Sequence, residues 1–254
     1  MVVDGPRRVT TRKLLCGRYR IDRSSVRGHI ARMAFIVWST PNPGVGDDYH
    51  TWYNEVHLPD AIENGSFVAM HRYEAVGPGY CAAPFLSIAE ADYGSEAEAW
   101  AAVRPRAQAL RDAGRIDDLY RVDFAVMLLT VDTDVSFHDV ETLTTVQNDW
   151  RNPGDDAPRW LASITVPEAS SRSMQLFTTD PEGQHGPGLH LALFESDAGL
   201  DETVDAWSGV GTAGSSPTPP YTTLFGVEGV PATHQPDRAE TWVQHWRHLV
   251  TVGR

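Results

Sequence analysis

The sequence predicts an α+β fold built from two tandem ferredoxin-like, or split-βαβ, units. Two observations favour it. Strand and helix patterns follow the order β-α-β-β-α-β over residues 32–134, and a weaker copy follows at an offset of roughly 101 to 107 residues. We expect a basic leader over 1–31, a first unit over 32–134, a second, degenerate unit over 135–234 and a C-terminal helix over 235–254.

The elements of the first unit follow from apolar spacing and from helix signals. Asp47 or Asp48 can cap a first helix, and Pro59 is expected to end it because its ring cannot continue the backbone hydrogen bonding. Ser95 and Gly114 bracket a second helix. The expected strands are 33–39, 67–75, 84–92 and 119–129, and the expected helices are 47–58 and 95–114.

The second copy is less regular. We expect strands over 160–166, 173–179, 189–197 and 221–230, with an acidic helix ending at Trp207. Only six residues separate the first two of these strands, so the helix between them is expected to be missing. A different register, with a strand near 141–146, stays open. The segment 236–250 suggests an amphipathic helix with Trp242 and Trp246 on one face.

Charge is divided unevenly along the chain. Residues 1–32 hold nine Lys or Arg against two Asp, a balance of +7, and the remaining residues have a balance of −20. Residues 33–254 therefore repel the phosphate backbones of nucleic acids, which argues against nucleic-acid binding outside the leader. We expect the leader to be a disordered extension, which would be consistent with a true translation start at Met33, directly before the first strand. A functional arm is the alternative.

The sequence shows few other features that would indicate a class of protein. No apolar run approaches the roughly 18 residues that span a bilayer, so no membrane partner is expected. Cys16 and Cys81 provide neither a disulfide framework nor a CxxC site, which fits a reducing cytoplasm.

A short polar-aromatic helix is the best clue to function. Residues 47–60 combine two histidines, two tyrosines and a tryptophan, a mixture that a helix built only to support a core does not need. At 3.6 residues per turn, His50, Tyr53 and His57 fall on one face. An aromatic face with proton-transfer groups indicates a site of acid–base chemistry.

The stretch 52–75 resembles a motif of EthD-like proteins in the dimeric α/β-barrel superfamily. The matching residues are Trp52, Tyr53, His57, Pro59, Phe67 and Arg72. The sequence Gly65-Ser66-Phe67 departs from the more usual Pro-Gly-Phe. The resemblance implies that two ferredoxin-like units form a barrel, here as a pseudo-dimer within one chain. The superfamily includes polyketide cyclases, cofactor-free monooxygenases, lyases, dehydratases, isomerases and haem enzymes, so the resemblance implies a fold and only a choice of functions.

We expect His57 to act as general acid or base, with Asp60 orienting it. Tyr53 and His71 would hold the resulting oxyanion. Alternatives for single residues stay open: a structural His57 and a packing Tyr53. For Arg72 they are a rim ion pair or an inward side chain paired with Asp123, with Glu90 or with an anionic substrate. The residues expected to line or enclose the substrate site are Trp38, His50, Trp52, Phe67, Arg72 and Tyr73.

The expected function is a cofactor-independent cyclase, dehydratase or C–C lyase that acts on a hydrophobic aromatic or polyketide-like metabolite. No metal is expected, because His50 and His57 lie two turns, or about 10 Å, apart along the helix. The alternatives are a cofactor-free monooxygenase on the same substrates, a non-catalytic small-molecule binder, and a haem protein with His190 as ligand. Pairing into a homodimer is left open.

Overall fold

The computed structural model describes residues 11–12, 32–76, 83–116, 118–131, 140–148, 166–167, 173–180, 182–183, 189–207 and 241–253. The elements in the first half are β1 (Thr11–Arg12), β2 (Arg32–Pro41), α1 (Gly46–Trp52), the π-helical turn η1 (Tyr53–His57), α2 (Leu58–Glu63), β3 (Ala69–Val76), β4 (Phe85–Asp92), α3 (Glu96–Asp112) and β5 (Tyr120–Thr130). Those in the second half are β6 (Thr142–Asn148), β7 (Val166–Pro167), β8 (Ser173–Thr179), β9 (His190–Ser196), α5 (Leu200–Trp207) and β10 (Thr241–Gly253).

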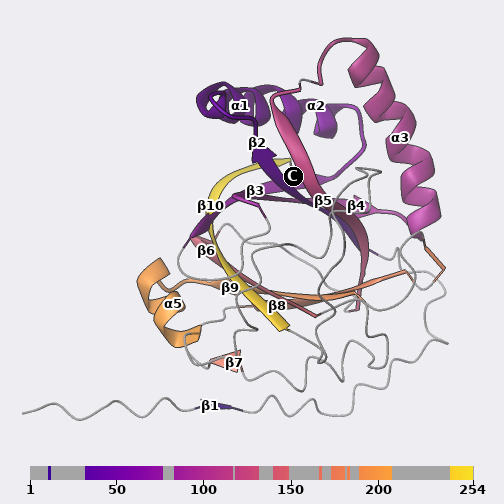
Figure 1. Cartoon of the computed structure of the whole chain (residues 1–254). Helices are drawn as coiled ribbons and strands as arrows, with labels where there is room; N and C mark the ends of the chain where they lie inside the picture. Colours follow the sequence, from indigo (N-terminus) through magenta and orange to yellow (C-terminus); the bar gives the residue numbers. More distant parts are fainter. Residues whose placement is uncertain are drawn as a thin grey trace, which may run out of the picture.

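Eight strands form a closed barrel in the order β10-β3-β4-β2-β5-β8-β9-β6, and every neighbouring pair is antiparallel (Figure 1). The first half supplies the run β5-β2-β4-β3 and the second half the run β10-β6-β9-β8. When only the barrel strands are counted, each run has the order fourth, first, third and second strand of its half of the sequence. The separate pair β1–β7 lies outside the barrel.

The first-half predictions of element type and order are confirmed. Helices α1, α2 and α3 lie on the outer side of the first-half strands (Figure 1). Because successive side chains of a strand alternate between faces, each strand sends one set inward and one set toward the helices. The inward set forms one buried cluster with members from all eight strands, including Trp38, Tyr73, Ile88, Phe124, Val126, Leu143, Phe177, Leu193 and Trp246. The barrel interior is therefore a packed core.

The prediction that Pro59 ends the first helix is wrong. The helix continues through α2 to Glu63, with Pro59 in its first turn. In a regular α-helix the ring of Pro59 would meet the carbonyl of Glu55, four residues earlier. The chain widens instead into the π-helical turn η1, where the Leu58 N–H donates to the Tyr53 carbonyl, five residues back. The wider turn accommodates the proline without breaking the helix.

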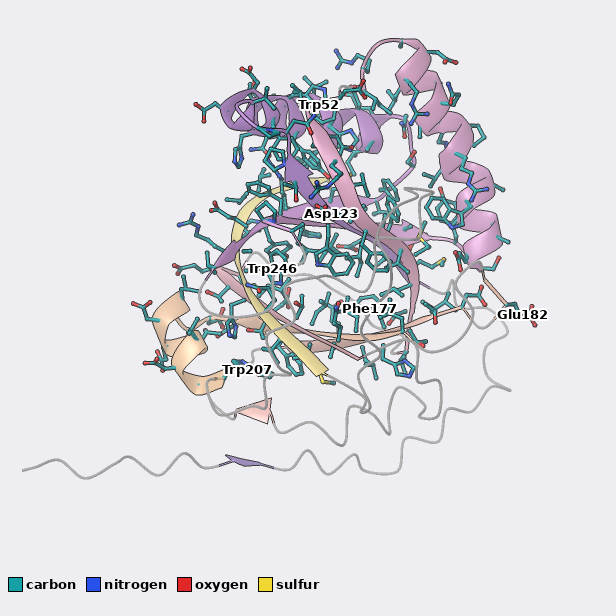
Figure 2. All side chains as sticks on the ribbon, viewed as in Figure 1. Trp52, Asp123, Phe177, Glu182, Trp207 and Trp246 are labelled. Atoms are coloured by element: carbon teal, nitrogen blue, oxygen red, sulfur yellow. The ribbon has the colours of Figure 1, made fainter. Side chains whose placement is uncertain are left out.

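The prediction of a C-terminal helix over 236–250 is also wrong, because residues 241–253 form β10, the strand that closes the barrel. The segment does alternate as a strand: Val243 belongs to the outer cluster under α5, whereas Trp246 points into the barrel core. Figure 2 shows Trp246 and Phe177 inside the barrel and Trp207 below it. The open edges of β3 and β6 each pair with this segment, and that tertiary pairing overrides the helical spacing of the two tryptophans.

Other second-half expectations have mixed outcomes. The strands 173–179 and 189–197 and the helix ending at Trp207 are present as β8, β9 and α5, and the strand near 141–146 that was left open is β6. The expected strands over 160–166 and 221–230 fall outside the described residues, except for Val166 in β7. So does the leader, except for Thr11–Arg12. No helix within the described ranges has the length and apolarity needed to cross a membrane.

Candidate functional site

Arg72 lies at the centre of an aromatic cluster between the helices and the outer face of the sheet. The side chain is 0% exposed. Its Cζ atom lies 4.5 Å from the ring centre of Tyr53, 4.7 Å from that of Tyr49 and 4.9 Å from that of Phe85. A desolvated cation over an aromatic face is stabilised by about 2 kcal/mol or more. Three rings therefore take the place that a carboxylate usually takes beside a buried arginine.

The hydrogen-bonding groups of Arg72 are only partly used. Nη1 donates to Oδ1 of Asn54 at 2.6 Å, whereas Nε and Nη2 are buried with no hydrogen-bond partner among the described residues. Neither alternative for Arg72, a rim ion pair or an inward pair with Asp123 or Glu90, is what the structure shows. Asp123 pairs with Arg121, and Glu90 bonds His71 on the opposite face of the sheet. Two nitrogen atoms of the guanidinium, which carry three N–H groups, thus have no hydrogen-bond acceptor among the described residues.

His57 lies in the same cluster, at the end of η1. Its ring stacks on Trp52 with centroids 4.9 Å apart and meets the ring of Tyr53 edge-on at 4.8 Å. Its Nδ1 atom is buried without a hydrogen-bond partner in the described part of the chain. Burial, and secondarily the charge of Arg72, lower the pKa of His57 to about 4, although Asp60 acts in the opposite sense. The imidazole is therefore uncharged at neutral pH.

Three phenols surround the arginine and the histidine. Tyr49 and Tyr53 are buried under the helix, and Tyr120 packs against both at 5.5 and 5.8 Å between ring centroids. Burial raises the pKa of Tyr49 and of Tyr53, and raises the pKa of Tyr120 to about 12. The Tyr49 hydroxyl lies 2.8 Å from Oγ of Ser39. All three side chains keep their O–H protons at neutral pH and remain hydrogen-bond donors.

The local backbone explains why these groups meet. Tyr53 and His57 are the first and last residues of the π-helical turn, and π-turns within α-helices occur frequently at functional sites. Arg72 reaches the cluster from β3, where alternation sends it toward the helices. Trp52, Tyr53, His57 and Arg72, four of the six residues that match the EthD-like motif, therefore lie together. Trp52 is labelled in the helix layer in Figure 2.

Asp60 does not take the role expected for it. Its two carboxylate oxygens accept hydrogen bonds from Nε and Nη2 of Arg115, both at 2.8 Å. This fork-shaped ion pair ties α2 to the segment after α3. The charge of Asp60 still acts on His57 through space and raises its pKa, but both carboxylate oxygens are bonded to Arg115 and not to the imidazole.

The remaining expected site residues divide between two faces. His71, Tyr73 and Trp38 point into the barrel, on the opposite side of the sheet from His57, so the expectation that they share one pocket with it is not met. His71 bonds Glu90 at 3.0 Å and Thr251 at 3.0 Å. Phe67 packs on Phe35 with centroids 5.7 Å apart, and both rings lie between the cluster of Tyr49 and Tyr53 and the cluster under α3.

His50 does lie at the margin of the cluster, with its ring 4.8 Å from that of Phe85. Burial and Arg72 lower the pKa of His50. Sequence reasoning missed Tyr120 and Phe85 as ring partners and Asn54 as the acceptor for Arg72. Phe85 could have been found, because it lies on the same face of β4 as the outward side chains of β3. Tyr120 lies on a strand far along the chain, and no local signal connects it to the helix.

No group of three or more His, Cys, Asp or Glu that could hold a metal ion occurs among the described residues. The haem alternative depends on His190, which is buried on β9 with its Nδ1 atom 3.1 Å from Oγ1 of Thr178. The hydrogen bond at Nδ1 fixes the orientation of the ring, and the haem alternative stays a prediction.

A surface groove of about 480 Å³ lies elsewhere, along α3. Trp100, Arg104 and Glu182 are among its lining residues, and none of the expected site residues is. Figure 2 shows Glu182 at the edge of the molecule, well away from Trp52.

No protein-family model and no curated protein matches this chain. Among solved structures it is similar to an anthrone oxidase-like protein, with 9% identity, a TM-score of 0.46, and 89% of this chain and 94% of that one covered. It is also similar to a putative chlorite dismutase, TA0507, with 8% identity, a TM-score of 0.44, and 87% of this chain and 95% of that one covered. A mutant chlorite dismutase from Candidatus Nitrospira defluvii has 9% identity and a TM-score of 0.40, with 88% of this chain and 95% of that one covered. Similarity this slight carries no argument about activity, and the fold described above rests on this chain's own strand pairing.

Proposed function

We propose that this protein is a cofactor-independent enzyme that abstracts a proton from a hydrophobic aromatic or polyketide-like metabolite, with His57 as the base. The observation that supports this most is the buried guanidinium of Arg72, whose Nε and Nη2 are open donors beside an uncharged imidazole. A neutral base next to a fixed positive charge is the arrangement that turns an acidic C–H or O–H into an anion.

The proposed step moves one proton and no other atom. Nδ1 of His57 accepts the proton, and the electron pair of the broken bond stays on the substrate as an enolate or phenolate. Nε and Nη2 of Arg72, with the Tyr53 hydroxyl, donate hydrogen bonds to the new oxyanion. The depressed pKa of His57 is no obstacle, because an anion forming between imidazole and guanidinium raises that pKa as the proton arrives.

The enolate or phenolate could proceed to ring closure, loss of water or C–C cleavage, which gives the cyclase, dehydratase and lyase readings. Reduction of O2 by the same anion gives the monooxygenase alternative. The EthD-like resemblance of residues 52–75 supports this range of chemistry, since four of its matching residues lie in the cluster. A small-molecule binder without turnover is the alternative from another class.

The architecture belongs to the same proposal. We infer a single-chain pseudo-dimer of two ferredoxin-like units, because both halves of the barrel have the same strand order. The polar and aromatic side chains that contact Arg72 come from the first half alone, and the second half adds only the apolar Leu249, Val250 and Val252 of β10 to the same cluster. This supports one site per chain. A ligand titration should then saturate at one equivalent per chain. Pairing of whole chains into a homodimer stays a prediction.

The test is proton exchange. Hydrophobic 1,3-diketones and phenols are incubated with the protein in D2O, and deuterium entering the acidic position is followed by mass spectrometry. Wild type should accelerate exchange for at least one probe, and His57→Gln should lose about 100-fold or more of that acceleration. His50→Gln, two turns away along the same helical segment, is the matched control and should stay near wild type.

Three outcomes separate the alternatives. Full activity in a folded His57→Gln variant refutes the proposed base. Saturable probe binding with no exchange and no turnover in wild type identifies a binder. O2 consumption that depends on the probe and on His57 selects the monooxygenase reading.

A further inference from the structure

We propose that Glu90, His71, Thr251 and His248 form a proton relay that connects the barrel interior with its rim at β10. The relay is separate from the proposed function, since its residues lie on the opposite face of the sheet from His57. Failure of either proposal would leave the other standing.

The relay is an unbroken series of three hydrogen bonds across three neighbouring strands. Nε2 of His71 on β3 lies 3.0 Å from Oε1 of Glu90 on β4. Nδ1 of the same ring lies 3.0 Å from Oγ1 of Thr251 on β10. The Thr251 hydroxyl in turn lies 2.9 Å from Nε2 of His248. All three distances are within the normal range for hydrogen bonds.

Burial changes along the series in the direction that a relay needs. Glu90 is 5% exposed and His71 is 3% exposed, so both are enclosed by the barrel. Thr251 and His248 are half-buried, nearer the solvent. A buried carboxylate that exchanges protons normally requires water to enter or the structure to open. The relay supplies a path that requires neither.

A backbone irregularity builds the contact between His248 and Thr251. Residues three apart on a regular strand point to opposite faces. Here a bulge at Leu249 shifts the register, so that His248 pairs with Tyr73 and Thr251 pairs with His71. Tyr73 and His71 point to the same face of β3, and the bulge therefore brings His248 and Thr251 onto one face as well. The ring of His248 packs against that of Tyr73, with centroids 5.5 Å apart.

The hydrogen bonds can all run in one direction. With neutral imidazoles, the His248 Nε2–H donates to Thr251, the Thr251 hydroxyl donates to His71 Nδ1, and the His71 Nε2–H donates to the Glu90 carboxylate. When His248 takes up a proton from solvent at Nδ1, its Nε2 proton passes to Thr251, the Thr251 proton to His71 and the His71 Nε2 proton to Glu90. The result is neutral His248 and a protonated Glu90, with one proton moved and no electron transferred.

The test is infrared difference spectroscopy of the full chain after a rapid pH drop. The carboxylic C=O band of Glu90 is assigned by its loss in Glu90→Gln, and its rise time is the rate of proton delivery. Thr251→Val removes the central hydroxyl while keeping the shape, and it should slow delivery by about 100-fold. Thr251→Ser restores the hydroxyl and should return the rate to near wild type.

Two further variants keep the outcome interpretable. Thr178→Val is the matched control, since it removes a threonine hydroxyl 3.1 Å from Nδ1 of another buried histidine, His190, and should leave the rate unchanged. His248→Gln removes the imidazole at the other end of the series from Glu90 and should slow delivery as Thr251→Val does, even if the valine variant fails to fold. The relay is refuted if either variant delivers protons at the wild-type rate, or if the Glu90 band never appears over the pH range in which the protein stays folded.

Discussion

The guanidinium of Arg72 lies 4.5 Å from the ring centre of Tyr53, and this pairing of a buried cation with a phenol face defines the site. A permanent charge is enclosed between β3 and the helix that ends at Glu63, with aromatic rings as its main neighbours. Enclosing a cation without a carboxylate costs solvation free energy that rings only partly offset. An arrangement of this kind is better explained by an anion that binds there than by stability.

The first prediction separates those two explanations. Arg72→Met should lower proton-exchange activity by about 100-fold or more, because the donors to the oxyanion are lost. Its free energy of unfolding should stay unchanged or rise by about 1–4 kcal/mol, because a hydrophobic side chain replaces a desolvated charge. Urea unfolding and the exchange assay measure the two effects. A variant that unfolds easily and retains activity when folded would show that the arginine is structural.

The second prediction concerns stability between about pH 4 and pH 6.5. The pKa of His57 falls from 6.5 to about 4 on folding, so the unfolded chain binds the proton more readily. Stability is therefore complete above pH 6.5, declines as the pH falls and levels off below about 4. The shift corresponds to at most about 3 kcal/mol. Urea unfolding of His57→Phe should show a shallower decline over this range.

His245 provides the comparison for that measurement. Burial also lowers its pKa to about 4, so it contributes a decline of the same sign over the same range. His57→Phe should thus remove only part of the slope, and a double variant with His245→Leu should remove more. If the single variant keeps the full wild-type slope, His57 binds protons equally well in the folded and unfolded states. The assignment of a buried, neutral imidazole to the folded state would then be wrong.

The third prediction follows from the π-helical turn. Pro59→Ala supplies an N–H and removes the ring that disfavours a regular α-helix, so the turn over Tyr53–His57 should tighten. The imidazole would then rotate away from Trp52, and exchange activity should fall while the unfolding free energy changes by less than about 1 kcal/mol. A crystal structure of the variant would show the hydrogen-bonding pattern directly. An unchanged π-turn would mean that packing, and not Pro59, sets it.

The fourth prediction concerns the barrel core. Trp246 is 1% exposed, and its indole N–H donates to Thr145 at 2.9 Å. Trp246→Ala should lower the free energy of unfolding by about 3–5 kcal/mol, because it leaves a large cavity. Trp52→Ala, a half-buried tryptophan of the helix layer, is the control and should cost less. Equal losses would contradict the assignment of Trp246 to the core.

Features set by local sequence could be predicted, whereas features set by long-range strand pairing could not. The first-half order was predictable because alternation in 84–92 and the Ser95 cap are local signals, and each has a matching element. For the segment 236–250 the local signals conflict, because both helical spacing and strand alternation can be found in it. Its two tryptophans, four residues apart, fit a helix, and only the unpaired edges of β3 and β6 decide the outcome.

The candidate site shows the same division. The motif residues Trp52, Tyr53, His57 and Arg72 were identified from one stretch of chain, and they do meet. Placing His71 beside them required knowing which face of β3 points inward, and that face is set by barrel closure. The partner of Asp60 is Arg115, 55 residues away on a loop, and no spacing rule connects the two.

The pairing of β10 with β3 joins residues roughly 170 positions apart, for example His245 with Val76. Pairing between strands so far apart in the sequence forms slowly, and during synthesis one edge of β3 stays unpaired until residues 241–253 have been made. Nascent chains of this protein should therefore depend on holdase chaperones at the ribosome, and an early stop codon that removes only the final strand should yield insoluble material despite leaving His57 and Arg72 encoded intact.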